Sequence, residues 1–246
     1  MKFFFTIMLV FYSLSSFAQK MTETQIMNQV DHLYRSKSSY AEVEMLVKNP
    51  RYERTLKLKV WSEEMMNTLI EVVFPNKEKG TKTLKKGTQV WNYLPKVDQV
   101  VAIPPSMMMS NWMGSDLTND DLVKQTTLVS HYSGHYVPCR GNLSNELCLE
   151  LKPKEKTVSV WGKIVLAVQK TDYFPLRQEF YNESQNLVRT FFYSDRKEIQ
   201  GRSIPTTLKV IMQNNSAQET TLHYNSIDFS AQLESNHFSE SQLRRK

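Results

Sequence analysis

The chain has 246 residues, of which 40% are hydrophobic and only seven are glycine. This length suits one large β domain, and the sequence holds no G-x-S-x-G, Walker or glycine-rich dinucleotide motif, which excludes the commonest hydrolase and nucleotide-binding signatures. The net charge is +6, which is too mild a surplus to indicate nucleic acid, so we expect no nucleic-acid partner.

Residues 1–18 predict a secretory signal peptide that is cleaved after Ala18. Lys2 supplies the positive charge before an apolar run over 3–12, and Ser16 and Ala18 place small residues at the −3 and −1 positions. The alternative is a membrane anchor, but the run is too short to span ~30 Å of hydrocarbon comfortably. We therefore expect an exported, periplasmic protein.

Residues 19–246 contain no Pro/Gly/Ser-rich linker, which predicts a single domain. Thr22 and Gln25 fit a capping box, and the apolar spacing after them predicts an amphipathic helix over 22–36.

After this helix, apolar residues recur at every second position instead of at helical spacing. This alternation predicts strands near 41–47, 56–60 and 69–74. Within these strands Met45, Leu58 and Ile70 occupy inward-facing positions. Such positions are equally consistent with plain core packing and with the lining of a ligand cavity.

Three further short strands are predicted at 81–86, 88–94 and 97–103, before Pro104-Pro105 breaks the last of them. Trp91 and Tyr93 share one face of the middle strand, and we favour that face as the one lining a cavity.

A methionine-rich segment follows the Pro-Pro break. Methionine and aromatic side chains form an adaptable apolar surface, so this segment predicts a binding site for a variable apolar ligand. The alternative is that these side chains fill the core or lie beneath a lid. The candidate contacts are Met107, Met108, Met109, Trp112 and Met113.

Thr118 with Asp121 predicts the cap of a short helix that ends near 124. Strand and turn patterns then fill the rest of the chain, and a last helix or turn lies within 235–243. The strands are expected near 126–138, 146–152, 157–170, 176–182, 187–195, 204–213 and 219–229.

The alternation predicts a mainly β protein. We expect one curved antiparallel sheet of about eleven strands, which forms an open half barrel whose apolar concave face is covered by short helices. The pattern alone does not separate a filled core from a ligand cavity.

Cys139 and Cys148 flank a polar stretch that reads as a turn. In an exported protein this arrangement predicts a disulfide. Two free buried thiols or half of a metal site are the alternatives.

The sequence favours no metal and no cofactor. An EF-hand that begins at Asp116 fails, because position six is not glycine and Thr127 stands where a bidentate Glu belongs. His131 and His135 are four residues apart, but the sequence between them reads as strand or turn and no third ligand is evident.

Four blocks of the sequence resemble the LolA-like family of outer-membrane lipoprotein-sorting proteins. They are FPNKEKGTKTLKKG (74–87), VWNYLPKVDQVVAIPPSMMMSNWMGSDLTNDDLV (90–123), PLRQEFYN (175–182) and HFSESQL (237–243). The resemblance implies a periplasmic half barrel with a helical lid over a cavity that shields acyl chains. It further implies an acylated lipoprotein or lipid as ligand, with an inner-membrane transporter and an outer-membrane acceptor as partners.

We therefore expect a monomeric carrier rather than an enzyme, because no nucleophile–base constellation is visible in the sequence. The alternative function is a lipid-binding module that is not a carrier, either an accessory subunit of a lipid exporter or an envelope lipid sensor.

Overall fold

The computed structural model describes residues 20–64, 66–123, 128–141, 144–155, 157, 159–214 and 217–245. The predicted signal peptide, 1–18, lies outside these residues. Within them, no helix is long and apolar enough to cross a membrane.

The described strands form one antiparallel sheet in the order β6-β5-β4-β3-β2-β1-β13-β12-β11-β10-β9-β8-β7. Consecutive strands of the chain are neighbours in the sheet, except that β6 and β7 lie at its two edges, and the first strand, β1, pairs with the last, β13. The strands are β1 (Ser38–Asn49), β2 (Tyr52–Glu63), β3 (Asn67–Phe74), β4 (Lys82–Lys86), β5 (Gln89–Leu94), β6 (Gln99–Ala102), β7 (Tyr132–Val137), β8 (Glu146–Pro153), β9 (Lys163–Gln169), β10 (Pro175–Tyr181), β11 (Leu187–Ile199), β12 (Arg202–Met212) and β13 (Glu219–Asp228).

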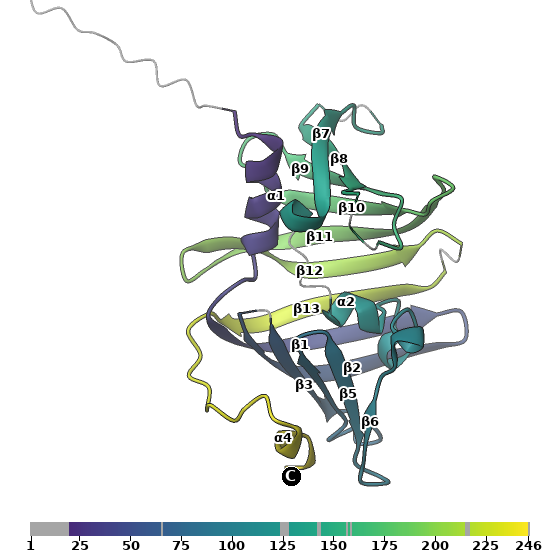
Figure 1. Ribbon diagram of the computed structural model, residues 1–246, viewed down its shortest axis with the longest axis vertical. Helices are drawn as coiled ribbons and strands as arrows, with labels where there is room; N and C mark the ends of the chain where they lie inside the picture. Colours follow the sequence, from purple (N-terminus) through teal and green to yellow (C-terminus); the bar gives the residue numbers. More distant parts are fainter. Residues whose placement is uncertain are drawn as a thin grey trace, which may run out of the picture.

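The sheet is strongly curved, and short helices other than the C-terminal one lie over one of its faces (Figure 1). The predicted half barrel is confirmed, with thirteen described strands in place of about eleven. The helical segments are α1 (Glu23–His32), the 3-10 turns η1 (Pro105–Met107) and η2 (Trp112–Gly114), α2 (Asn119–Val123), α3 (Leu128–His131) and α4 (Glu240–Arg244).

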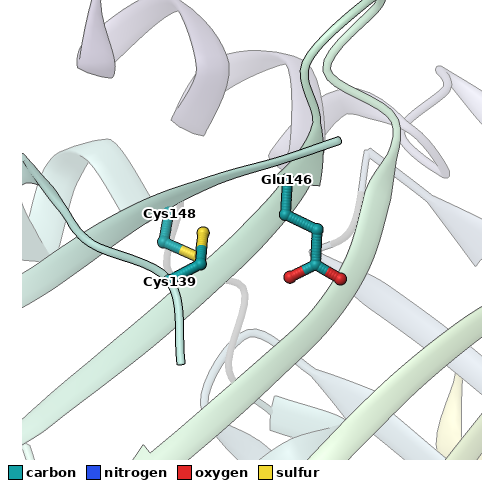
Figure 2. A group of neighbouring side chains, drawn as sticks. All are labelled: Cys139, Glu146 and Cys148. Carbon is teal, nitrogen blue, oxygen red and sulfur yellow. A yellow bond between two sulfur atoms is a disulfide. The ribbon is translucent and has the colours of Figure 1, made fainter. Parts of the chain in front are cut away.

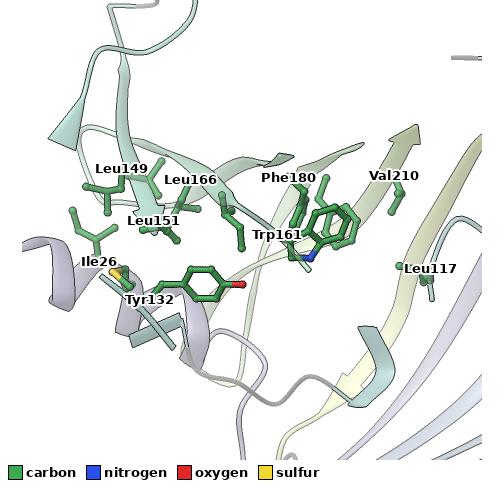
Figure 3. Packing of buried hydrophobic residues seen from close by; sticks show 13 residues of the cluster. Ile26, Leu117, Tyr132, Leu149, Leu151, Trp161, Leu166, Phe180 and Val210 are labelled. Carbon is green, nitrogen blue, oxygen red and sulfur yellow. The ribbon is translucent and has the colours of Figure 1, made fainter. Parts of the chain in front are cut away.

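The face of the sheet beneath α1, which we call the inner face, carries a large apolar cluster (Figure 3). Ile26 and Met27 of α1 pack there with Leu149, Leu151 and other apolar residues of strands β8 to β12. The amphipathic stripe of α1 therefore packs on the sheet, as its period predicts.

A second inner-face cluster lies on β1, β2 and β3, with Trp112 packed against it. A third cluster lies on the opposite, outer face, where Leu84 and Tyr93 contact Phe238 and Leu243 of the C-terminal segment. Because successive side chains of a strand alternate, Thr83 and Leu84 of β4 point to these two different faces.

Helix α1 begins after the predicted cap, since the Thr22 hydroxyl accepts the Gln25 backbone N–H and the Gln25 side chain accepts the Thr22 N–H. It ends at His32, four residues before the predicted end at 36.

The predicted strand at 126–138 is wrong in its first part, because Leu128–His131 forms α3 and only Tyr132–Val137 forms a strand. The carboxylate of Asp31 accepts the backbone N–H groups of Leu128 and Val129 and so caps α3 from another helix. This contact from a distant segment leaves no trace in the local sequence pattern. Similarly, the predicted strand at 157–170 is a strand only over Lys163–Gln169.

The predicted disulfide joins Cys139 and Cys148 across the turn between β7 and β8, with a Cα–Cα distance of 5.3 Å (Figure 2). Closing so short a loop stabilises a fold by about 2–3 kcal/mol in the chain-entropy model. Among the described residues, the two cysteines and Glu146 form the only group of three or more potential metal ligands whose ligand atoms lie within 4.8 Å of one another. Since both sulfurs are used in the disulfide, this group does not offer two thiolates to a metal.

Candidate functional site

The methionine loop, which we define as residues 104–118, is fastened to the start of α2. The Asn119 side-chain amide donates to the Met107 carbonyl over 3.1 Å, and the Asp120 backbone N–H donates to the Met108 carbonyl over 2.7 Å. The loop and the helix are therefore held together by hydrogen bonds.

The same loop is anchored on the inner face of the sheet by Trp112. Its indole Nε1–H donates to the hydroxyl of Thr83 over 3.1 Å, and its ring is only 3% exposed. The Arg54 guanidinium donates to the Met113 carbonyl from strand β2. The loop is thus bonded to two different strands of the half barrel.

The structure brings five of the predicted contact residues together on the inner face. They come from β1, β2, β3 and the methionine loop and share one apolar cluster: Met45, Leu58, Ile70, Trp112 and Met113. Lipid contact by these side chains stays a prediction.

Trp91 and Tyr93 lie apart from that cluster. Both pack with the outer-face cluster beneath α4, on the opposite side of the sheet from Trp112. Tyr93 also donates from its hydroxyl to Asp98 over 3.1 Å. Trp91 in addition borders a pocket at the end of its strand.

Two of the predicted methionines point to solvent, because Met107 is 48% exposed and Met109 is 44% exposed. Met108, between them, is half-buried. Exposure of apolar methionine side chains to water is unfavourable. Methionines at the surface near a pocket are typical of an adaptable binding surface.

The pocket lies where strand β5 begins and strand β6 ends, against the methionine loop and α2, and its volume is about 560 Å³. This volume is within the ordinary range of small-ligand sites, roughly 300–1,000 Å³. Apolar side chains dominate the wall, and one acid stands at its edge. The main lining residues are Val90, Trp91, Ala102, Pro105, Met108 and Asp120.

Sequence reasoning missed a buried ion pair on the inner face. Arg189 of β11 donates both terminal nitrogens to Asp121 of α2, over 2.7 and 2.6 Å. Thr118 completes the carboxylate's bonds by donating its backbone N–H and its hydroxyl, each over 2.8 Å. The predicted helix cap is therefore confirmed, and it has a second partner from the sheet.

A signal for this pair was present in the chain. Arg189, Phe191 and Tyr193 alternate on one face of β11, so an arginine stands in a row of inward aromatic side chains. Burial alone would raise the pKa of Asp121, but the hydrogen bonds and the charge of Arg189 outweigh burial and lower that pKa.

The contact between α1 and α3 depends on Asp31, whose burial raises its pKa to about 6 despite two backbone hydrogen bonds and the nearby charges of Arg35 and His32. The pKa in the folded state exceeds the ordinary value of 3.8, so folding opposes ionisation of this carboxyl. The resulting penalty is absent below about pH 4 and complete above about pH 6.

We therefore expect Asp31→Asn to stabilise the protein at pH 7.5 by about 1–2 kcal/mol and to have little effect at pH 4. Urea unfolding across this pH range measures the difference between the variant and the wild type. Glu53→Gln, at an exposed position of β2, is the control and should show no such pH-dependent gain. An equal effect of Asp31→Asn at both pH values would contradict the assignment.

Comparison with known proteins shows which proteins share this architecture. Residues 64–245 match the model of a family described only as an uncharacterized protein. A search of curated proteins finds no match.

Among solved structures, a domain named for outer membrane lipoprotein sorting from Vibrio parahaemolyticus is 24% identical with a TM-score of 0.76, covering 90% of this chain and 98% of that one. A DUF1329 family protein from Desulfovibrio piger is 24% identical with a TM-score of 0.77, covering 89% and 97%. A LolA superfamily protein from Nitrosomonas europaea is 22% identical with a TM-score of 0.73, covering 90% and 99%. These likenesses establish a shared fold over nearly the whole of each chain.

Proposed function

The chain belongs to the family whose model matches residues 64–245, and it shares its fold with a LolA superfamily protein and with an outer membrane lipoprotein-sorting domain; we propose that it is a periplasmic carrier of acyl chains. It takes up the acyl chains of a lipoprotein or lipid and moves them toward the outer membrane. The carrier acts as a single domain, 19–246, without bond-making chemistry. An inner-membrane transporter supplies the ligand and an outer-membrane acceptor receives it.

The observation that carries this proposal is the apolar pocket of about 560 Å³ beside the methionine loop. One wall is the end of the β5–β6 hairpin, and the other is a loop that is bonded to α2 and to the inner face. Removing an acyl chain from water yields about 0.8 kcal/mol per CH2. A pocket of this composition supports uptake, and its lining residue Met108 stands between the exposed Met107 and Met109 in the chain.

The test is binding of a photoactivatable palmitate to the delipidated mature protein, with the cross-linked residues identified by mass spectrometry. We expect cross-links at Trp91 or Met108. Ala102→Trp, which fills the pocket from β6, should weaken binding at least tenfold.

Val101→Trp is the matched control, because Val101 neighbours Ala102 on the same strand, is itself exposed and does not line the pocket. Equal losses in the two variants would contradict the pocket as the acyl site. Failure of the wild type to bind palmitate would contradict the carrier function.

A vesicle assay separates a carrier from an accessory subunit or a sensor. A carrier accelerates movement of a fluorescent lipid from donor to acceptor vesicles in proportion to its own concentration. A protein that binds lipid but leaves this rate unchanged would instead be an accessory subunit or a sensor.

A further inference from the structure

The inner face of the half barrel holds a positive charge in an aromatic surrounding. Arg189 is 2% exposed, and its guanidinium lies over the rings of Trp161, Phe180 and Phe191 at 4.7–4.8 Å from their centroids. Figure 3 shows Trp161 and Phe180 side by side in this cluster. Aromatic faces favour a desolvated cation and hold the planar fork in one orientation.

Among the described residues, no carboxylate of a strand forms an ion pair with this cation. Its partner, Asp121, comes from α2, which is part of the cover. The Nε–H group of Arg189 is buried and has no hydrogen-bond partner among the described residues. The Nε–H therefore remains available while each terminal nitrogen donates to the carboxylate.

Opening of the cover would remove Asp121 and leave the arginine charge uncompensated. An unpaired buried charge is strongly unfavourable, at several kcal/mol. Entry of a neutral acyl chain would leave that penalty in place. A ligand that brings its own anion would replace Asp121 and relieve the penalty.

We propose that Arg189 binds an anionic oxygen group, a phosphate or a carboxylate, that is carried by the acyl ligand, and that Asp121 occupies this position in the ligand-free protein. This inference rests on the proposed acyl-binding function and narrows its ligand to anionic lipids. An arginine fork matches phosphate and carboxylate oxygens in a bidentate geometry. The surrounding apolar cluster, which includes Leu208 and Leu222, suits the adjoining acyl chain.

Continuity between the two sites supports the assignment. Asp120 borders the apolar pocket, and the next residue, Asp121, holds Arg189. A shift of α2 would therefore change the pocket wall and the ion pair together.

The test compares two lipids that differ only in the phosphate, oleoyl lysophosphatidic acid and monoolein, on delipidated full-length mature protein. We expect lysophosphatidic acid to bind at least tenfold more tightly. Arg189→Gln should bring this ratio close to one, while Asp121→Asn, which removes the competing anion, should raise it. Arg196→Gln is the matched control, because Arg196 lies on the same strand with a 43% exposed side chain.

A ratio near one in the wild type, or an unchanged ratio in Arg189→Gln, would overturn the anion site while leaving the carrier function standing. If neither lipid bound, the proposed function would fail with it. Inorganic phosphate that stabilised Asp121→Asn as much as lysophosphatidic acid does would identify free phosphate, rather than a lipid, as the ligand.

Folding is checked by near-ultraviolet circular dichroism. If Arg189→Gln does not fold, Arg189→Lys retains the charge without the fork, and we expect it to reduce the ratio several-fold. Asp121→Asn leaves Arg189 intact and provides a second test. If the ratio of the two lipid affinities were unchanged in both Arg189→Lys and Asp121→Asn, the assignment would be overturned.

Discussion

Replacing Asp121 with alanine is expected to lower the free energy of unfolding by about 3–5 kcal/mol, because the variant leaves Arg189 buried without a counter-charge. The pair is not an exposed surface bridge, since the side chains of Arg189 and Asp121 are 3% and 15% exposed. Exposed ion pairs contribute only about 0–1 kcal/mol, so the expected loss distinguishes a buried pair from an exposed one. Urea unfolding at pH 7 measures it.

A double-mutant cycle provides the control for this prediction. Arg189→Met fills the aromatic surrounding with an uncharged side chain of similar length, and the double variant with Asp121→Ala removes both charges. We expect the double variant to be more stable than Asp121→Ala alone, since replacing a buried pair by apolar groups is often neutral. Strictly additive losses would contradict direct coupling between the two side chains.

Much of the fold could be predicted from the sequence because the strands alternate cleanly. Strand β1 is an example: Ala41, Val43, Met45 and Val47 are buried, as their spacing requires. The boundaries failed where a partner from elsewhere decided the local structure. Leu128–His131 falls within a segment predicted as a strand but forms a helix, since Asp31 caps it from α1.

The candidate site was predicted less completely than the fold. The methionine loop was found from its composition, and Trp112 lies on the inner face with Met45, Leu58 and Ile70. Alternation shows that Trp91 and Tyr93 share a face, but the face is decided by α4, more than a hundred residues later in the chain. The ion pair between Asp121 and Arg189 likewise joins α2 and β11, two elements that only the curved sheet brings together.

Replacing Trp112 with alanine is expected to lower the free energy of unfolding by about 3–5 kcal/mol, as for other large buried side chains. The indole is 3% exposed in a cluster with Val43, Leu56 and Leu58, so its removal leaves a cavity on the inner face. The variant also leaves the Thr83 hydroxyl without the Nε1–H donor at 3.1 Å. Trp112→Phe, which keeps an aromatic ring, should lose less.

Met109→Ala provides the matched control, because Met109 lies in the same loop but is 44% exposed, and surface substitutions usually change stability by less than about 0.5 kcal/mol. Urea unfolding of the three variants compares the loss of stability at the buried Trp112 with the loss at the exposed Met109 of the same loop. If Trp112→Ala unfolded like Met109→Ala, the loop would be held by its bonds to α2 and Arg54 rather than by the tryptophan. A large loss confined to Trp112 would instead mean that the pocket wall depends on one side chain inserted into the half barrel. Ligand uptake would then be altered most by substitutions at that anchor.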